Sequence, residues 1–169
     1  MKAILLLVIV CLFSVFSFSQ SVAVKGYVRS VSPGTVPVGV TNENGTPANK
    51  KSGPKDQHLI YLLHAKTIRV IPVEMWLNGE HYAISQTNVS SPVTITDNTI
   101  PSNTKKIILV PATYKNVVQL SPIPSVETKV ISAAQKAKTN EAVIVYKQNG
   151  KFYTTTIKKL TRLEPLMGE

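Results

Sequence analysis

The stretch from Glu74 to Tyr82, EMWLNGEHY, carries two carboxylates, a histidine and the only tryptophan of the chain. Two carboxylates flanking one bond could hydrolyse a glycoside, and a carboxylate beside a histidine could orient a general base. Both chemistries require the side chains to lie on the same side of the backbone. The local structure of this stretch therefore decides between an active site and a simple turn.

The Asn78-Gly79 pair predicts a two-residue type I′ turn, because both positions of that turn need a positive φ. The strands on either side would then pair Leu77 with Glu80 and Trp76 with His81. Side chains alternate along a strand, so Glu74 and Glu80 fall on opposite faces, which excludes a paired acid and base. The trio Glu74, Trp76 and His81 shares one face, and we interpret it as a surface aromatic–histidine group that could bind a ligand. No nucleophile accompanies it, so we assign no catalytic residue.

The same pattern places Val73, Met75, Leu77, Tyr82 and Ile84 on the other face, which we expect to be the core. Pro72 cannot donate a ladder hydrogen bond, so its strand is expected to be an edge strand or to bulge at that point.

A second Asn-Gly pair, Asn149-Gly150, predicts another hairpin over 142–159. Here Tyr146 would face Tyr153 and Lys147 would face Phe152. Basic residues interleaved with aromatic residues can bind phosphates, bases or sugars, although lysines also protect sheet edges from aggregation. The candidate binding residues of this region are Tyr146, Lys147, Lys151, Phe152, Lys158, Lys159 and Arg162.

Metal binding is not expected. His58 and His64 would lie roughly 20 Å apart on one strand at about 3.3 Å per residue, and the three histidines form no spaced ligand motif. The sequence also lacks the short motifs of serine hydrolases, zinc proteases, nucleotide-binding loops and calcium-binding loops. We therefore predict no cofactor and no metal, although a motif-free hydrolase stays open as an alternative.

The chain begins with the pattern of a secretory signal peptide. Lys2 precedes an apolar run, and Ser17-Phe18-Ser19 offers small residues at a cleavage site before Gln20. We predict a signal peptide over 1–19 and a single β-rich domain over 20–169; a retained N-terminal anchor is the alternative. Cys11 is the only cysteine, so the processed chain would have no thiol or disulfide chemistry. A secreted protein without cysteines favours a bacterial periplasm, envelope or exterior.

The processed chain would be strongly basic. Loss of Lys2 lowers the formal charge from +10 to +9, and the segment from Lys129 to Arg162 holds eight basic residues against Glu141 alone. Such charge favours an envelope protein or an anionic surface or glycan as partner, whereas nucleic acid is disfavoured. The partner itself is unknown from the sequence, and the processed chain has no expected transmembrane segment.

The remaining pattern predicts a mainly β fold, with α+β as the variant. Strands are expected near 21–31, 58–65, 93–96, 106–110 and 117–120 in addition to the two hairpins, giving roughly seven to nine strands. One helix is expected near 125–138, before the C-terminal hairpin. The Pro- and Gly-rich segment 32–57 is expected to be a long loop, and 162–169 a loose tail. The architecture is predicted to be antiparallel, either a sandwich or a curved sheet.

These patterns support three functional classes. The first is a non-catalytic secreted or envelope module for binding or assembly, favoured by regular strands without a catalytic motif. The second is an extracytoplasmic hydrolase whose site is built by the fold. The third is a secreted inhibitor or effector that uses the 32–57 loop.

Overall fold

The computed structural model describes residues 22–32, 55–97, 105–124 and 131–167. The predicted signal peptide, most of the 32–57 segment and the start of the predicted helix lie outside these ranges. Within them the chain is mainly β, as the sequence predicted, with one short helix before the C-terminal strands.

The strands, in chain order, are β1 (Val22–Ser32), β2 (Lys55–His64), β3 (Val70–Leu77), β4 (Glu80–Val89), β5 (Val93–Asp97), β6 (Lys105–Val110), β7 (Asn116–Pro124), β8 (Ala142–Gln148), β9 (Lys151–Ile157), β10 (Thr161–Arg162) and β11 (Leu166–Met167). The helix α2 (Ile131–Ala137) precedes β8.

One curled sheet dominates the fold, and its order is β10-β1-β2-β7-β4-β3-β8-β9. Every pairing from β1 through to β9 is antiparallel. Each antiparallel pairing reverses the strand direction. Six such pairings separate β1 from β9, so these two strands run in the same direction. The curl brings them together, and the chain leaving β9 then pairs in parallel with β1 through β10 and β11. Of the two predicted architectures, the curved sheet is the one found.

The two ends of the sheet meet at Gly26 in β1. A Cβ atom at this position would lie 2.5 Å from a terminal methyl group of Ile157 and 2.5 Å from one of Leu160. A side chain here would force the ends of these two side chains to shift, so glycine suits the close approach of β9 and the following turn to β1. We call this line of contact the seam.

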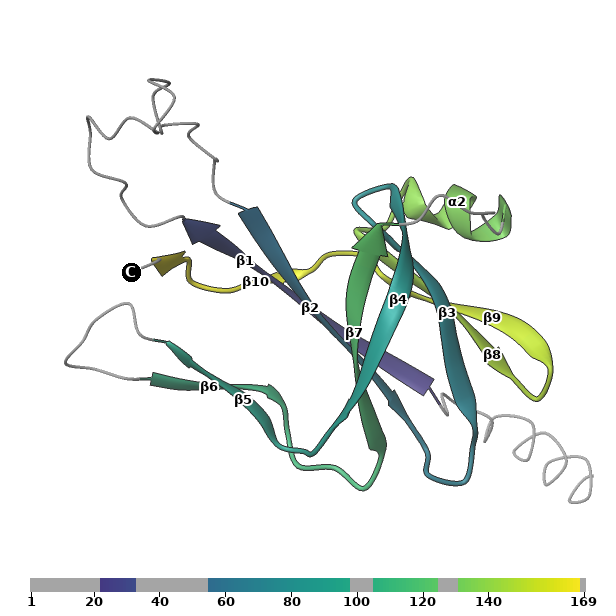
Figure 1. Cartoon of the computed structure of the whole chain (residues 1–169), viewed down its shortest axis with the longest axis horizontal. Helices are drawn as coiled ribbons and strands as arrows, with labels where there is room; N and C mark the ends of the chain where they lie inside the picture. The colour runs from purple at the N-terminus through teal and green to yellow at the C-terminus, as the bar shows by residue number, and fades with distance from the viewer. Residues whose placement is uncertain (1–21, 33–54, 98–104, 125–130, 168–169) are drawn as a thin grey trace, which may run out of the picture.

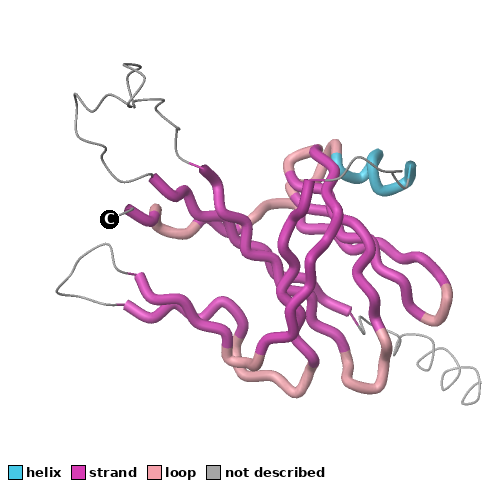
Figure 2. The backbone as a smooth tube through the Cα atoms, viewed as in Figure 1, coloured by secondary structure: helices cyan, strands magenta, loops and turns pink. Residues whose placement is uncertain are grey.

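The inner face of the curl holds the largest hydrophobic core. Its fully buried side chains come from strands distributed around the sheet: Ile60, Leu62, Met75, Leu120 and Ile144. Two further apolar clusters lie on the outer face. The β5–β6 hairpin covers β1, β2 and β7 through Leu109 and Val110, and α2 covers β3 and β8 through Ala133 and Ala137. Figure 2 shows the helix and this hairpin as separate additions to the curled sheet.

Both predicted Asn-Gly turns are present. Asn78, Gly79, Asn149 and Gly150 all have φ between 50° and 85°, as a type I′ turn requires. The register is also as predicted, with Leu77 opposite Glu80.

Three expectations need correction. The predicted loose tail is docked on the outer edge of β1 by β10 and β11, and Leu160 just before it is buried. Of the two outcomes expected at Pro72, the bulge is the one found, in a strand interior to the sheet. This bulge turns Val73 outward, so that it is 42% exposed instead of in the core. Lys55–Gln57, assigned to the loop, belong to β2.

Candidate functional site

The first candidate group, Glu74, Trp76 and His81, is assembled as its strand register predicts, but it is not on the surface. Nε2 of His81 lies 2.8 Å from Oε2 of Glu74, and both side chains are only 7% exposed. The Trp76 ring lies 5.0 Å from the His81 ring, centroid to centroid. The prediction of a surface group was wrong because α2 packs over this face of β3 and β8, with Trp76 in the same cluster as Ala133 and Ala137.

This burial limits what the trio can do. A carboxylate hydrogen-bonded to an imidazole could in principle orient a general base. Here the pair instead satisfies two polar groups that the fold largely removes from water, and buried polar groups need such partners. None of the surface hollows described below is lined by Glu74, Trp76 or His81. We therefore treat the trio as structural.

The second hairpin brings its aromatic residues together as predicted, on two opposite faces. On the inner face the rings of Tyr146 and Tyr153 stack, with centroids 5.8 Å apart and an interplanar angle of 21°. On the outer face the Lys147 ammonium lies 5.8 Å from the centre of the Phe152 ring. The register in both pairs is the predicted one.

The predicted basic residues of this region do not form one patch. Lys151 follows the turn, whereas Lys158 lies beyond the other end of β9, roughly 20 Å away at about 3.3 Å per residue. Lys158 borders a small hollow beside the end of α2. Lys159 is exposed, and Arg162 is exposed within β10, opposite Val28. The hairpin pattern therefore predicted correctly which tyrosines oppose each other, but it did not predict where the basic residues lie relative to one another.

A groove of about 710 Å³ lies at the part of the seam that β10 and β11 leave open. Residues 27–32 of β1 pair on this side with the C-terminal segment, but among the described residues Val22–Val24 have β2 as their only partner strand. Facing them across the groove is β9, which pairs only with β8 in the described part of the chain. Two strand edges therefore form the walls. The lining residues are Val22, Ala23, Val24, Tyr146, Gln148, Asn149, Tyr153, Thr154, Thr155 and Thr156.

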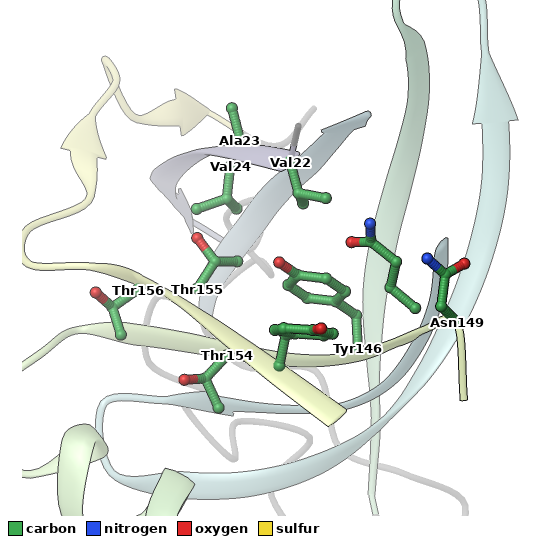
Figure 3. A pocket seen from close by; sticks show the side chains of 10 residues that line it. Val22, Ala23, Val24, Tyr146, Asn149, Thr154, Thr155 and Thr156 are labelled. Atoms are coloured by element: carbon green, nitrogen blue, oxygen red, sulfur yellow. The ribbon is translucent and has the colours of Figure 1, made fainter. Parts of the chain in front are cut away.

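The lining of this seam groove is polar but uncharged. Hydroxyl groups of tyrosine and threonine and the amides of Gln148 and Asn149 can each donate and accept hydrogen bonds. Figure 3 shows the Tyr146 hydroxyl directed toward Val22, across the space between the two strands. Burial raises the pKa of the Tyr146 hydroxyl, and the neighbouring Tyr153 raises it further. Tyr146 therefore stays neutral at physiological pH and offers both a ring face and a hydroxyl.

Two other features that could indicate a function, a metal-binding cluster and a membrane-spanning helix, are not found among the described residues. No three His, Cys, Asp or Glu side chains of this part of the chain lie close enough together to hold a metal ion. None of its helices is long and apolar enough to cross a membrane. Comparison with protein-family models, with curated proteins and with solved structures gave no match to this chain.

Of the residues that line the groove, the sequence named Tyr146 alone as a candidate binding residue and placed Tyr153 opposite it, without predicting the groove. The signal it used was the Asn149-Gly150 turn, which sets the tyrosines opposite one another. The opposing wall, Val22–Val24, carries no local signal, because it reaches the groove only when the sheet curls.

Proposed function

We propose that this protein is a non-catalytic binding module, exported from the cytoplasm, and that the seam groove takes a sugar unit. The observation that carries the proposal is the groove itself, with a tyrosine pair at its base, amides and hydroxyls around it and no charged side chain. Export is supported by the N-terminal leader pattern.

A sugar suits this lining for two reasons. Its hydroxyl groups donate and accept hydrogen bonds, as do the amides and hydroxyls of the groove. Its C–H faces pack against aromatic rings, which supply large, rigid contact area with a polar edge. The volume of about 710 Å³ lies within the range of small-molecule sites, roughly 300–1,000 Å³. An apolar ligand would leave the amides and hydroxyls unpaired and would bind poorly.

The alternatives have less support. A hydrolase would need an accessible acid or base, and both side chains of the Glu74–His81 pair are only 7% exposed. An inhibitor acting through the 32–57 loop stays a prediction, since 33–54 lies outside the described residues.

Two neighbouring residues of β9 supply a matched test. Tyr153 and Phe152 are both exposed aromatic side chains, at 44% and 59%, but only Tyr153 lines the groove. Binding of the secreted, purified protein to a panel of neutral and acidic oligosaccharides should be measured by calorimetry for Tyr153→Ala and Phe152→Ala.

We expect Tyr153→Ala to weaken binding about tenfold, equivalent to about 1.4 kcal/mol, because aromatic packing contributes at this level. Phe152→Ala should bind like the wild type. Equal losses in the two variants would show that the groove is not the site, and no binding to any member of the panel would overturn the sugar assignment.

A further inference from the structure

The seam groove is one end of a continuous series of surface hollows. It shares Asn149 with a hollow of about 320 Å³ at the β8–β9 turn. That hollow shares Arg69 and Ile71 with a larger one, of about 670 Å³, at the open end of the curled sheet. The larger one in turn shares Lys66, Asn88 and Asn116 with a fourth hollow of about 380 Å³. Because each hollow shares residues with the next, an extended ligand could follow all four.

The charge changes along this path. The seam groove has no charged side chain, whereas the other three hollows contain Lys147, Arg69, Lys66 and Lys115. No aspartate or glutamate lines any of the four within the described chain. We call the three charged hollows the cationic track.

No carboxylate of the described residues forms an ion pair with these cations. Among the described residues the only ion pair is that of His81 with Glu74. Other carboxylates are engaged elsewhere: Glu80 accepts a hydrogen bond from the Tyr82 hydroxyl, and Glu141 accepts one from the backbone N–H of Leu160. The positive charge of the track is therefore available to an anionic partner.

Uncharged polar groups lie between the cations. Asn116 of β7 is directly opposite His64 of β2. Asn88 of β4 is opposite Val118, which lies two residues along β7 from Asn116. Nδ1 of His64 lies 3.0 Å from the carbonyl oxygen of Ala65. In the neutral ring Nδ1 therefore donates to that carbonyl, and Nε2 is left as an acceptor. Amides and an imidazole between lysines suit a ligand that carries both hydroxyl and anionic groups.

We propose that the ligand is an acidic polysaccharide, one of whose sugar units occupies the seam groove while its anionic groups lie along the cationic track. This inference rests on the proposed function and extends it from a sugar to a charged polymer. The cations are spread over three open hollows, so a single small anion would meet only one or two exposed charges, each contributing little. A polymer with regularly spaced carboxylates or sulfates engages several at once, and its affinity benefits from their being linked.

Two variants with the same change in net charge give a controlled test. The track variant replaces four cations by glutamine, at Lys66, Arg69, Lys115 and Lys147. The control variant replaces four others, at Lys151, Lys158, Lys159 and Arg162, which do not line the track. The probes are polygalacturonic acid and its carboxyl-reduced, neutral form, measured at low and at moderate salt. Thermal melts of both variants check that folding is intact.

We expect the wild type to bind the acidic polymer more tightly than the neutral one and to lose this preference as salt rises, since screening acts over about 8 Å at physiological ionic strength. The track variant should lose at least tenfold in affinity for the acidic polymer and keep its affinity for the neutral one. The control variant should lose less than threefold.

The outcomes separate the two proposals. Equal losses in the two variants would show diffuse charge and overturn the track. Binding of the neutral polymer through Tyr153 without any preference for the acidic one would overturn the track and leave the sugar groove standing. A track-dependent loss confined to anionic vesicles or duplex DNA, measured as parallel arms, would overturn the polysaccharide assignment. Failure to bind either polymer or any oligosaccharide would overturn both proposals.

Discussion

Replacing Gly26 should open the seam and destabilise the whole fold. A Cβ atom there would lie 2.5 Å from methyl groups of both Ile157 and Leu160 and 3.1 Å from one of Ile60. Carbon atoms in van der Waals contact are about 3.5–4.0 Å apart, so at least two side chains must move. Leu160 is 3% exposed and Ile60 fully buried, so their methyl groups would have to shift within packed surroundings, whereas Ile157 is only partly buried.

The expected magnitude is the difference between two effects. Forcing an extra carbon into a packed core costs about 1–3 kcal/mol. Alanine in place of glycine within a strand recovers roughly 0.5–1 kcal/mol through the unfolded chain. The difference runs from about 0 to about 2.5 kcal/mol, so we expect Gly26→Ala to lower the free energy of unfolding by about 1 kcal/mol and Gly26→Val to lower it further.

Urea denaturation of the wild type, Gly26→Ala, Leu160→Ala and the double variant gives the necessary cycle. Leu160→Ala alone should cost about 2–5 kcal/mol, because it leaves a cavity. In the double variant the new methyl group occupies part of that cavity, so the total loss should fall short of the sum by about 1 kcal/mol or more. Additive losses in the cycle, or a Gly26→Val variant as stable as the wild type, would refute the close crossing at the seam.

Two other predictions concern buried polar groups. Glu74→Ala should lower the free energy of unfolding by about 2 kcal/mol, because it leaves the buried His81 ring without its acceptor; Glu74→Gln keeps a hydrogen-bonding group and should lose clearly less in the same urea melts, and equal losses would argue against the pair. Burial lowers the pKa of His58 from its ordinary value of 6.5, a shift that Asp56 partly opposes. The unfolded chain therefore binds this proton more readily than the folded one, so stability is present above about pH 6.5 and is lost as the pH falls through that value toward the lower folded pKa. The wild-type melting temperature should fall more than that of His58→Gln between about pH 7.5 and about pH 5.5, and parallel pH profiles would contradict this assignment.

Local sequence signals predicted the hairpins well, because a two-residue turn fixes register without help from the rest of the molecule. Asn78-Gly79 and Asn149-Gly150 determine which side chains oppose one another, and the structure follows both. The period of 58–65 likewise placed β2 in the interior of the sheet. The position of the tail near Arg162 could not be predicted from the sequence. A strand of two residues is too short to show an alternating pattern, and β10 and β11 are strands only because they pair with β1.

The candidate site was harder to predict because it depends on contacts between segments far apart in the sequence. The alternation around Trp76 correctly grouped it with Glu74 and His81 but could not show that α2 covers that face. The seam groove needs Val22–Val24 to approach β9, a contact set by the curl of the sheet and by the missing side chain at Gly26. Three cations of the track, Lys66, Arg69 and Lys115, come from connections between strands, where the sequence pattern gives no register, whereas Lys147 of β8 was already a candidate.

The pairing of Tyr27 with Thr161 has a consequence for how the protein is made. At roughly 5–20 residues per second, Tyr27 is synthesised roughly 7–27 s before Thr161, its partner. During that interval the valine-rich β1 can pair with β2 alone, and its other edge is open to strands of neighbouring chains. Contacts between such distant residues also form slowly. The sheet therefore closes only after Thr161 has been synthesised, and β10 and β11 then cover the edge of β1 that was open to aggregation.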